Sequence, residues 1–194
     1  MRPAMEDQHQ PVRVISRSRL EMLFDGVFAI AMTILVLELK VPDLEIADRR
    51  NSSLLLHELV KESGTFFSYL LSFAILGVFW WRHNHVYHYF RTITSKMLVL
   101  HFVQLAAAAF FPFTAALYGR YPTNFGGVLI YLACVATYLW ASFGNLIVAR
   151  RDGALSDDMT PETFAKMRRR TLRGALVMSA MFVVYVALAH GLVK

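Results

Sequence analysis

The sequence predicts an all-α membrane protein, a polytopic bundle whose helices cross the bilayer five times. Hydrophobic residues make up 56% of the 194 residues and charged residues only 18%, whereas soluble domains average roughly 45–50% and about 25%. One cysteine excludes a disulfide framework. Four segments lack Asp, Glu, Lys and Arg and approach or exceed the roughly 20 residues that span a bilayer as a helix. These segments are residues 63–81, 97–119, 121–149 and 174–193.

The first candidate span is shorter than these four. Residues 26–37 form a run of 12 uncharged residues between Asp25 and Glu38. Such a run rises about 18 Å as a helix, less than a hydrocarbon core of roughly 30 Å. A signal-peptide core is the alternative, but no small-residue cleavage site follows it. If this segment does cross the membrane, Asp25 or Glu38 lies at the rim of the hydrocarbon core or inside it, and an ionisable residue there points to a functional site.

The predicted spans are approximately residues 19–40, 60–82, 95–119, 124–149 and 172–192. Residues 1–18 precede them as an amino-terminal segment, and residues 19–194 form one transmembrane domain. Fourteen of the 20 Lys and Arg residues fall on the side of the amino terminus, which the positive-inside rule places in the cytoplasm. The net charge of +6 is therefore explained by membrane rims. No nucleic-acid partner is expected.

Two connections contain helix starts. Residues 52–62 read as a helical extension of the second span, with Ser52 or Ser53 as its N-cap. Thr160 followed by Pro161 is typical of a helix that begins before the last span.

One face of the first span has a spacing of apolar residues that could serve packing or ion conduction. Ile30, Thr33, Ile34 and Leu37 follow the spacing i, i+3, i+4, i+7 and share one side of a helix. This face could pack against neighbouring helices or lipid. It could also line a cation path, because apolar constrictions gate ions by dewetting and hydroxyls replace part of a hydration shell. Glu38 then lies at the outer mouth.

Residues 19–37, RLEMLFDGVFAIAMTILVL, resemble the first helix of the lysosomal and endosomal potassium channel family, in its prokaryotic single-repeat branch. That family has an arginine, three residues, Phe-Ser-Asp and a Val-Phe-Ala-Ile-Ala-x-Thr-Leu-Leu pattern. Arg19 and Asp25 keep the family spacing, and Leu23 and Phe24 replace its Phe and Ser.

Two later segments add to the resemblance. Trp80, His83 and Asn84 are similar to the family's Trp-x-x-His-His, with Asn84 in place of the second histidine. Residues 111–114 are similar to its Leu-Pro-Phe-x-Thr. The three segments occur in the family's order, between about residues 19 and 150.

The resemblance implies a homotetramer in the bilayer that conducts potassium ions passively and needs no cofactor. The family's apolar pore layers fall on Ile30, Ile34 and Leu37, and its threonine layer falls on Thr33. The resemblance also implies an internal polar network, here comprising Arg19, Asp25, Trp80, His83 and Asn84. The expected location is the plasma (inner) membrane of a bacterium.

The family has six helices, whereas five are counted. The sixth could follow residue 194, be absent, or arise if residues 121–149 crossed twice, for which 29 residues are too few.

The sequence gives less support to functions other than a channel. The sequence contains no recognisable phosphate-binding loop and no Ser–His–acid set, so nothing in it indicates an enzyme. A secondary transporter would be expected to have broken helices and internal repeats, and Pro112 is the one interior breaker. A proton or cation leak pathway is a further alternative.

The sequence places three histidines, His83, His85 and His88, within six residues, which favours an interfacial cluster; a metal site and a pH sensor are the alternatives. His101 and Gln104 are expected to hydrogen bond between helices.

Overall fold

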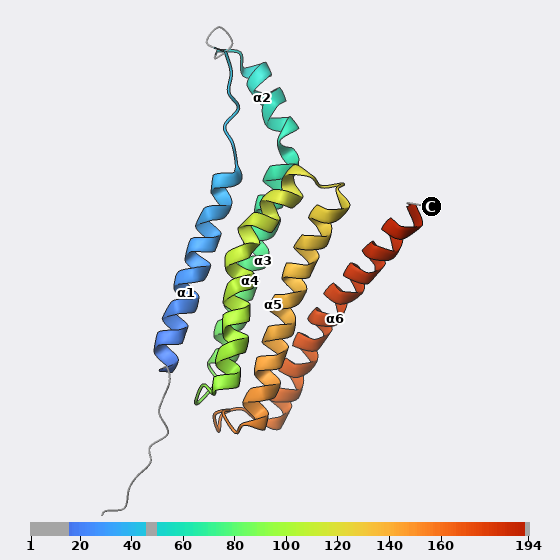
Figure 1. The fold of residues 1–194 in the computed structure, drawn as a ribbon. Coiled ribbons are helices and arrows are strands. Elements are labelled where there is room, and N and C mark those ends of the chain that lie inside the picture. The colour runs from blue at the N-terminus through green and yellow to red at the C-terminus, as the bar shows by residue number, and fades with distance from the viewer. Residues whose placement is uncertain (1–15, 46–49, 193–194) are drawn as a thin grey trace, which may run out of the picture.

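The computed structural model describes residues 16–45 and 50–192, and all of its regular elements are helices (Figure 1). Most of the predicted amino-terminal segment, residues 1–15, lies outside the described residues. The elements are α1 (Arg17–Ile34), the short 3-10 helix η1 (Leu35–Glu38), α2 (Ser52–Lys61), α3 (Ser63–Tyr87), α4 (Ser95–Arg120), α5 (Phe125–Arg151) and α6 (Pro161–Leu192).

Five helices of the described chain are long and apolar enough to cross a membrane, which confirms the predicted number. They are Arg17–Glu38, Ser63–Tyr87, Ser95–Arg120, Phe125–Arg151 and Pro161–Ala189. α2 has only 10 residues and projects beyond the end of the bundle (Figure 1). α5 is one continuous helix of 27 residues, so residues 121–149 do not contain two short passes.

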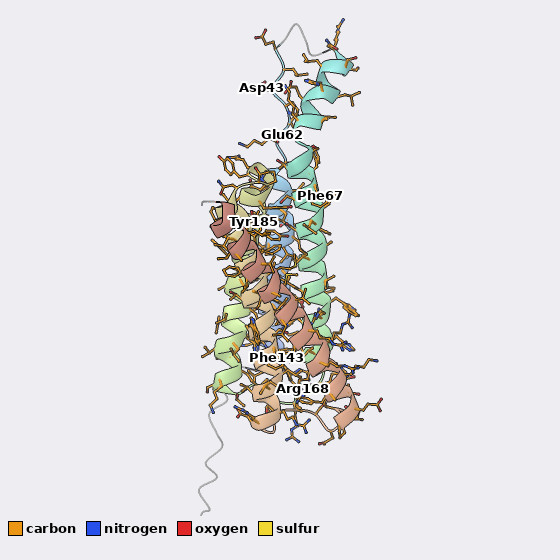
Figure 2. All side chains as sticks on the ribbon, turned by 90° about the vertical axis from the view of Figure 1, so that its right-hand side faces the viewer. Asp43, Glu62, Phe67, Phe143, Arg168 and Tyr185 are labelled. Atoms are coloured by element: carbon orange, nitrogen blue, oxygen red, sulfur yellow. The ribbon has the colours of Figure 1, made fainter. Side chains whose placement is uncertain are left out.

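The polar side chains concentrate towards the two ends of the bundle. Asp43 and Glu62 lie towards one end and Arg168 towards the other, whereas Phe67, Phe143 and Tyr185 lie between them (Figure 2). The α3–α4 turn and the α5–α6 connection meet at the end that holds Arg168 (Figure 1). Their backbones are joined by a hydrogen bond of 2.8 Å from the Ser156 amide to the Tyr89 carbonyl.

The two predicted helix starts have different outcomes. α6 begins at Pro161, and the Thr163 amide donates to the Thr160 hydroxyl at 3.1 Å, which confirms that N-cap. At α2 the cap is Asn51, whose side chain accepts from the Leu54 amide at 3.1 Å. The prediction of Ser52 or Ser53 was therefore wrong. Asparagine is as good a cap as serine, and with Asn51 as the cap the helix begins one residue earlier than a serine cap would place it.

Buried polar side chains link the central helices. The Asn145 amide on α5 donates to Gln104 Oε1 on α4 at 2.8 Å, which confirms the interhelical role of Gln104. The prediction for His101 was wrong, because its Nδ1 lies 2.7 Å from the Met97 carbonyl one turn earlier in the same helix. The His101 ring is instead buried among aromatic side chains of α1 and α3.

α3 and α4 approach each other closely around Gly119. The Ser68 hydroxyl donates to the Ala115 carbonyl at 2.6 Å. A Cβ atom on Gly119 would lie 3.0 Å from the Ser68 Cβ and 3.2 Å from the Thr65 Cα. Small residues at such contacts let membrane helices pack backbone to backbone.

Gly119→Ala is therefore expected to destabilise the bundle by about 1–3 kcal/mol, because the new methyl group meets backbone atoms that cannot move aside. Gly77→Ala is the matched control, since its Cβ would meet only the end of Met32 at 3.9 Å. Thermal unfolding of the two variants in detergent measures the difference. Equal midpoints would contradict the close contact at Gly119.

Candidate pore-lining helix

α1 packs against the bundle with one stripe of side chains. This stripe repeats every three or four residues and faces α3 and α4. Its members are each at most 2% exposed: Leu20, Phe24, Phe28, Ala31 and Leu35. The docked side of α1 is therefore fixed along its whole length.

The residues predicted to line a pore lie on a different side of α1. Ile30 is 60% exposed, Ile34 is 40% exposed and Leu37 is 73% exposed. Thr33 is exposed between them. Nothing in the described chain covers this apolar face.

The same exposed stripe continues towards the amino-terminal end of α1. Leu23 and Gly26 are exposed and precede Ile30 at spacings of seven and four, and Arg19 is exposed one turn before Leu23. Sequence reasoning did not assign Leu23 and Gly26 to this face, although extending the three–four spacing backwards would have found them. Such a spacing is the seam by which helices pack side by side around a common axis.

Thr33 uses its hydroxyl proton within the helix. Its Oγ1 donates to the Ile30 carbonyl at 2.8 Å, the local bond that threonine commonly makes in a span. The oxygen lone pairs remain on the exposed face. In this arrangement the hydroxyl is an acceptor towards the open side, which suits a cation rather than an anion.

Glu38 ends the 3-10 turn that follows α1 and is half-buried. It lines a small space together with Thr65 and Ser68 of α3 and Ala115 of α4. Its side chain therefore lies against the bundle and not on the exposed stripe with Leu37.

The predicted polar network is joined at one point. Trp80 Nε1 donates to Asp25 Oδ1 at 2.8 Å and ties α3 to α1. Arg19 lies on the exposed stripe, six residues from Asp25 and on a different side of the helix. The single salt bridge between described residues, Lys61 with Glu58, involves neither of them. Within the described chain, Arg19 and Asp25 are therefore not paired.

His83 takes no part in the Asp25 contact. Its ring stacks on Phe24 with centroids 3.6 Å apart and planes 5° apart. It is 7% exposed, and its Nε2 has no hydrogen-bond partner among the described residues. Asn84 is half-buried, and no side-chain hydrogen bond joins it to the other four residues in the described chain. His83 is thus part of an aromatic core.

The three histidines of the α3 end do not converge. His83 points into the bundle, whereas His85 is exposed and stacks on Trp81 at 6.0 Å between ring centroids. His88 is exposed beside Tyr89. The described residues contain no group of three metal-ligating side chains, so the geometry gives the metal alternative no support.

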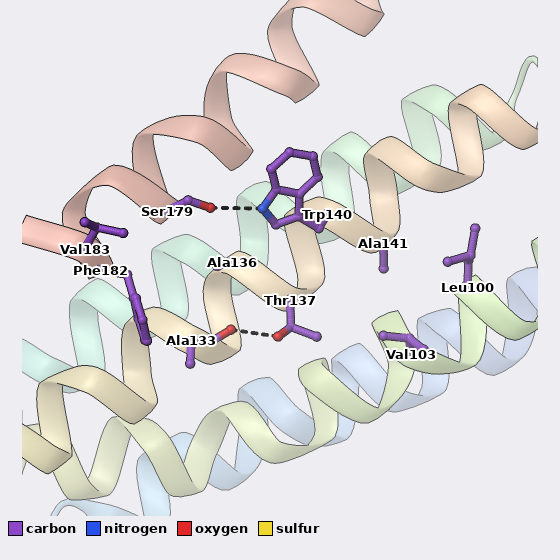
Figure 3. Close-up of a pocket in the computed structure, with 10 residues that line it drawn as sticks. All are labelled: Leu100, Val103, Ala133, Ala136, Thr137, Trp140, Ala141, Ser179, Phe182 and Val183. Atoms are coloured by element: carbon purple, nitrogen blue, oxygen red, sulfur yellow. Dashed lines mark hydrogen bonds between the residues drawn. The ribbon is translucent and has the colours of Figure 1, made fainter. Parts of the chain in front are cut away.

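A cavity of about 560 Å³ lies on another flank of the bundle, between α4, α5 and α6 (Figure 3). Trp140 Nε1 donates to Ser179 Oγ at 2.9 Å beside it, and Thr137 bonds back to the Ala133 carbonyl. Its lining is mostly apolar and includes no residue of α1. This cavity is therefore separate from the exposed stripe.

Comparison with known proteins supplies the family. Residues 19–112 match the model of the endosomal/lysosomal potassium channel TMEM175. A potassium channel of Streptomyces collinus is 33% identical over 103 residues, which cover 53% of this chain and 48% of the relative. A potassium channel of Chamaesiphon minutus is 28% identical over 156 residues, which cover 74% and 75%. The mouse endosomal/lysosomal proton channel TMEM175 is 33% identical over 109 residues, 55% of this chain and 21% of its own length.

The fold agrees with this assignment. The crystal structure of a lysosomal potassium-selective channel TMEM175 homolog from Chamaesiphon minutus superposes with a TM-score of 0.75 at 22% identity, covering 88% of this chain and 87% of the other. The matched segments span about half the length of the Streptomyces relative and about a fifth of the mouse protein. The family is one of channels, which confirms that the chain is not an enzyme. The chain is an integral membrane protein, and its residues 19–112 belong to the TMEM175 family.

Proposed function

We propose that this protein is a passive potassium-selective channel whose ion path runs between the α1 helices of a homotetramer. The observation that supports this most is the exposed apolar stripe of α1, which lies away from its packed side. An exposed apolar face within a span meets either lipid or another protein. The seam-like spacing and the hydroxyl within the stripe favour copies of α1 around a water-filled axis.

Each layer of the stripe has a physical role in this proposal. Rings of Ile30, Ile34 and Leu37 exclude water and form the constriction, because a narrow apolar ring dewets. The Thr33 hydroxyls lie between two of these rings and offer oxygen lone pairs to a partly dehydrated cation. Arg19 lies at the entrance of the stripe. The amino terminus faces the cytoplasm of a bacterial cell, on the side that holds most of the basic residues.

Reconstitution tests the activity. We expect purified protein in planar bilayers with potassium on one side and sodium on the other to show currents that reverse towards the potassium equilibrium potential. A protein that carries no cation current, or one that shows saturating exchange coupled to a second ion, would overturn the proposal. The second result would favour the secondary transporter.

A proton path is the second candidate, favoured by the names of the mammalian relatives, which are endosomal/lysosomal proton channels. A pH gradient across a bilayer with equal potassium on both sides separates the two candidates. A reversal potential that follows the proton gradient would assign protons as the main permeant ion.

Removing the Asp25 carboxylate is expected to impair assembly more than conduction. Asp25→Ala leaves the Trp80 indole without its acceptor, at a cost of about 0.6–2 kcal/mol for a polar bond within a membrane. Asp25→Asn keeps an acceptor oxygen and is the matched control. Size-exclusion chromatography in detergent gives the assembled fraction, and single-channel recording gives the conductance of the channels that form. Fully assembled Asp25→Ala tetramers that are silent would contradict a structural role.

A further inference from the structure

Three cavities follow one another between α3 and α6, along most of the length of the bundle. The first has a volume of about 310 Å³ and lies between the carboxyl-terminal part of α3 and the amino-terminal part of α6. The second and third have volumes of about 450 Å³ each. Arg82 lines the first and second cavities, and Ile75, Val135 and Met178 line the second and third. The three are therefore parts of one groove.

The first cavity is basic. Arg82, Lys166 and Arg170 line it, and none of its lining residues is Asp or Glu. Arg82 Nη2 donates to Thr171 Oγ1 at 3.1 Å, and the Arg170 guanidinium lies 5.6 Å from the centre of the Trp81 ring. None of the three cations forms an ion pair with a described carboxylate. The pocket thus gathers positive charge that the described chain leaves uncompensated.

The rest of the groove is apolar. Beyond Arg82 and Arg173, the second cavity is lined by carbon-rich side chains that include Val78, Leu139 and Val177. The third continues between Leu71 and Leu188 towards the opposite end of the bundle. α6 diverges from α5 in this direction (Figure 1). A basic pocket therefore adjoins two consecutive apolar cavities, with Arg82 at the boundary.

We propose that this groove binds one anionic phospholipid, with the headgroup phosphate in the basic pocket and an acyl chain along the apolar cavities. Phosphate oxygens are strong acceptors for arginine and lysine donors. A free phosphate ion would use only the first cavity, whereas a lipid satisfies both chemistries of the groove. A second protein chain without carboxylates at this place would leave Arg82, Lys166 and Arg170 buried and unpaired. The pocket also lies at the basic end of the bundle, where anionic lipids are attracted.

Lipid retention tests the proposal without any current measurement. Purified protein is incubated with equal amounts of phosphatidylglycerol and phosphatidylcholine in detergent micelles, and the bound lipids are counted by native mass spectrometry. We expect wild-type protein to retain phosphatidylglycerol preferentially. In the double variant Lys166→Gln, Arg170→Gln, the ratio of retained phosphatidylglycerol to phosphatidylcholine is expected to fall on the order of tenfold.

The matched control is the double variant Arg168→Gln, Arg169→Gln. It removes the same charge from the same helix, and its two residues are also exposed, but neither lines the groove. We expect it to retain phosphatidylglycerol like the wild type. A second variant, Val78→Trp, fills the apolar cavity without a change of charge. It is expected to reduce lipid retention, and it decides the question if the Lys166 and Arg170 variant fails to fold.

Three results would overturn the proposal. Equal loss in both double variants would assign the preference to general surface charge. Complete displacement of the lipid by excess inorganic phosphate, with Val78→Trp unchanged, would assign the pocket to a free anion. Disulfide cross-linking of Val177→Cys between two copies in phosphatidylglycerol vesicles would show that a second chain covers the groove.

Discussion

Replacing Ile30 with asparagine is expected to raise the resting cation current and to reduce the preference for potassium over sodium. Ile30 is 60% exposed on the stripe that we place around the ion path. An amide at this layer keeps water in the constriction, so that an ion no longer has to cross a dry ring. Lowering that barrier by about 1.4 kcal/mol raises the rate of crossing about tenfold. Current density at fixed protein amount and bi-ionic reversal potentials measure both effects.

Val36→Asn is the control for this prediction. Val36 is 47% exposed and lies in the same span, but it is on a different side of the helix from Ile30. Its replacement introduces the same amide with little expected change in current. A silent Ile30→Asn together with a leaky Val36→Asn would show that the ion path runs along another face of α1.

The face of the first span could be predicted from sequence because it depends only on local geometry. Helical spacing puts Ile30, Thr33, Ile34 and Leu37 on one side whatever the rest of the chain does. The packed stripe of Leu20, Phe24, Phe28, Ala31 and Leu35 has the same periodicity. Periodicity alone does not say which stripe meets the protein. The structure adds that information by showing which side chains α3 and α4 cover.

The network around Asp25 could be predicted only in part, because it depends on the register between helices. The Trp80 partner was expected from the resemblance, and the hydrogen bond of 2.8 Å joins these two residues. His83, three residues further along α3, is instead opposite Phe24. The family pattern has serine where this chain has Phe24, and the larger ring occupies the space beside the histidine.

Cavities between distant helices could not be predicted from spacing at all. Arg82 and Arg170 are 88 positions apart and were assigned to two separate connections on the same side of the membrane. They line one pocket because α6 starts at Pro161 and runs alongside the end of α3. Thr160 and Pro161 indicated in the sequence that α6 begins well before its membrane span. Nothing in the sequence indicated the direction in which α6 runs. Tilt is set by tertiary packing, on which the local sequence has little influence.

Phe24→Ala is expected to be the most destabilising single replacement in α1. The ring is completely buried, stacks on His83 and meets the edge of His101 at 5.5 Å between centroids. Its removal leaves a cavity between α1, α3 and α4, and buried Phe→Ala changes cost about 3–5 kcal/mol. The midpoint of thermal unfolding in detergent should fall well below that of the wild type. Phe24→Leu refills part of the space and should lose less.

Met22→Ala separates this packing effect from a general weakening of the helix. Met22 is 63% exposed two residues away on the same helix, so its truncation opens no cavity in the subunit. Equal midpoints for Phe24→Ala and Met22→Ala would mean that α1 does not dock through Phe24. The predictions for Phe24 and Ile30 also test each other. If one stripe of α1 anchors the helix and the other lines the path, Phe24→Ala lowers stability and assembly. Ile30→Asn then changes the current of a protein that unfolds at the wild-type temperature.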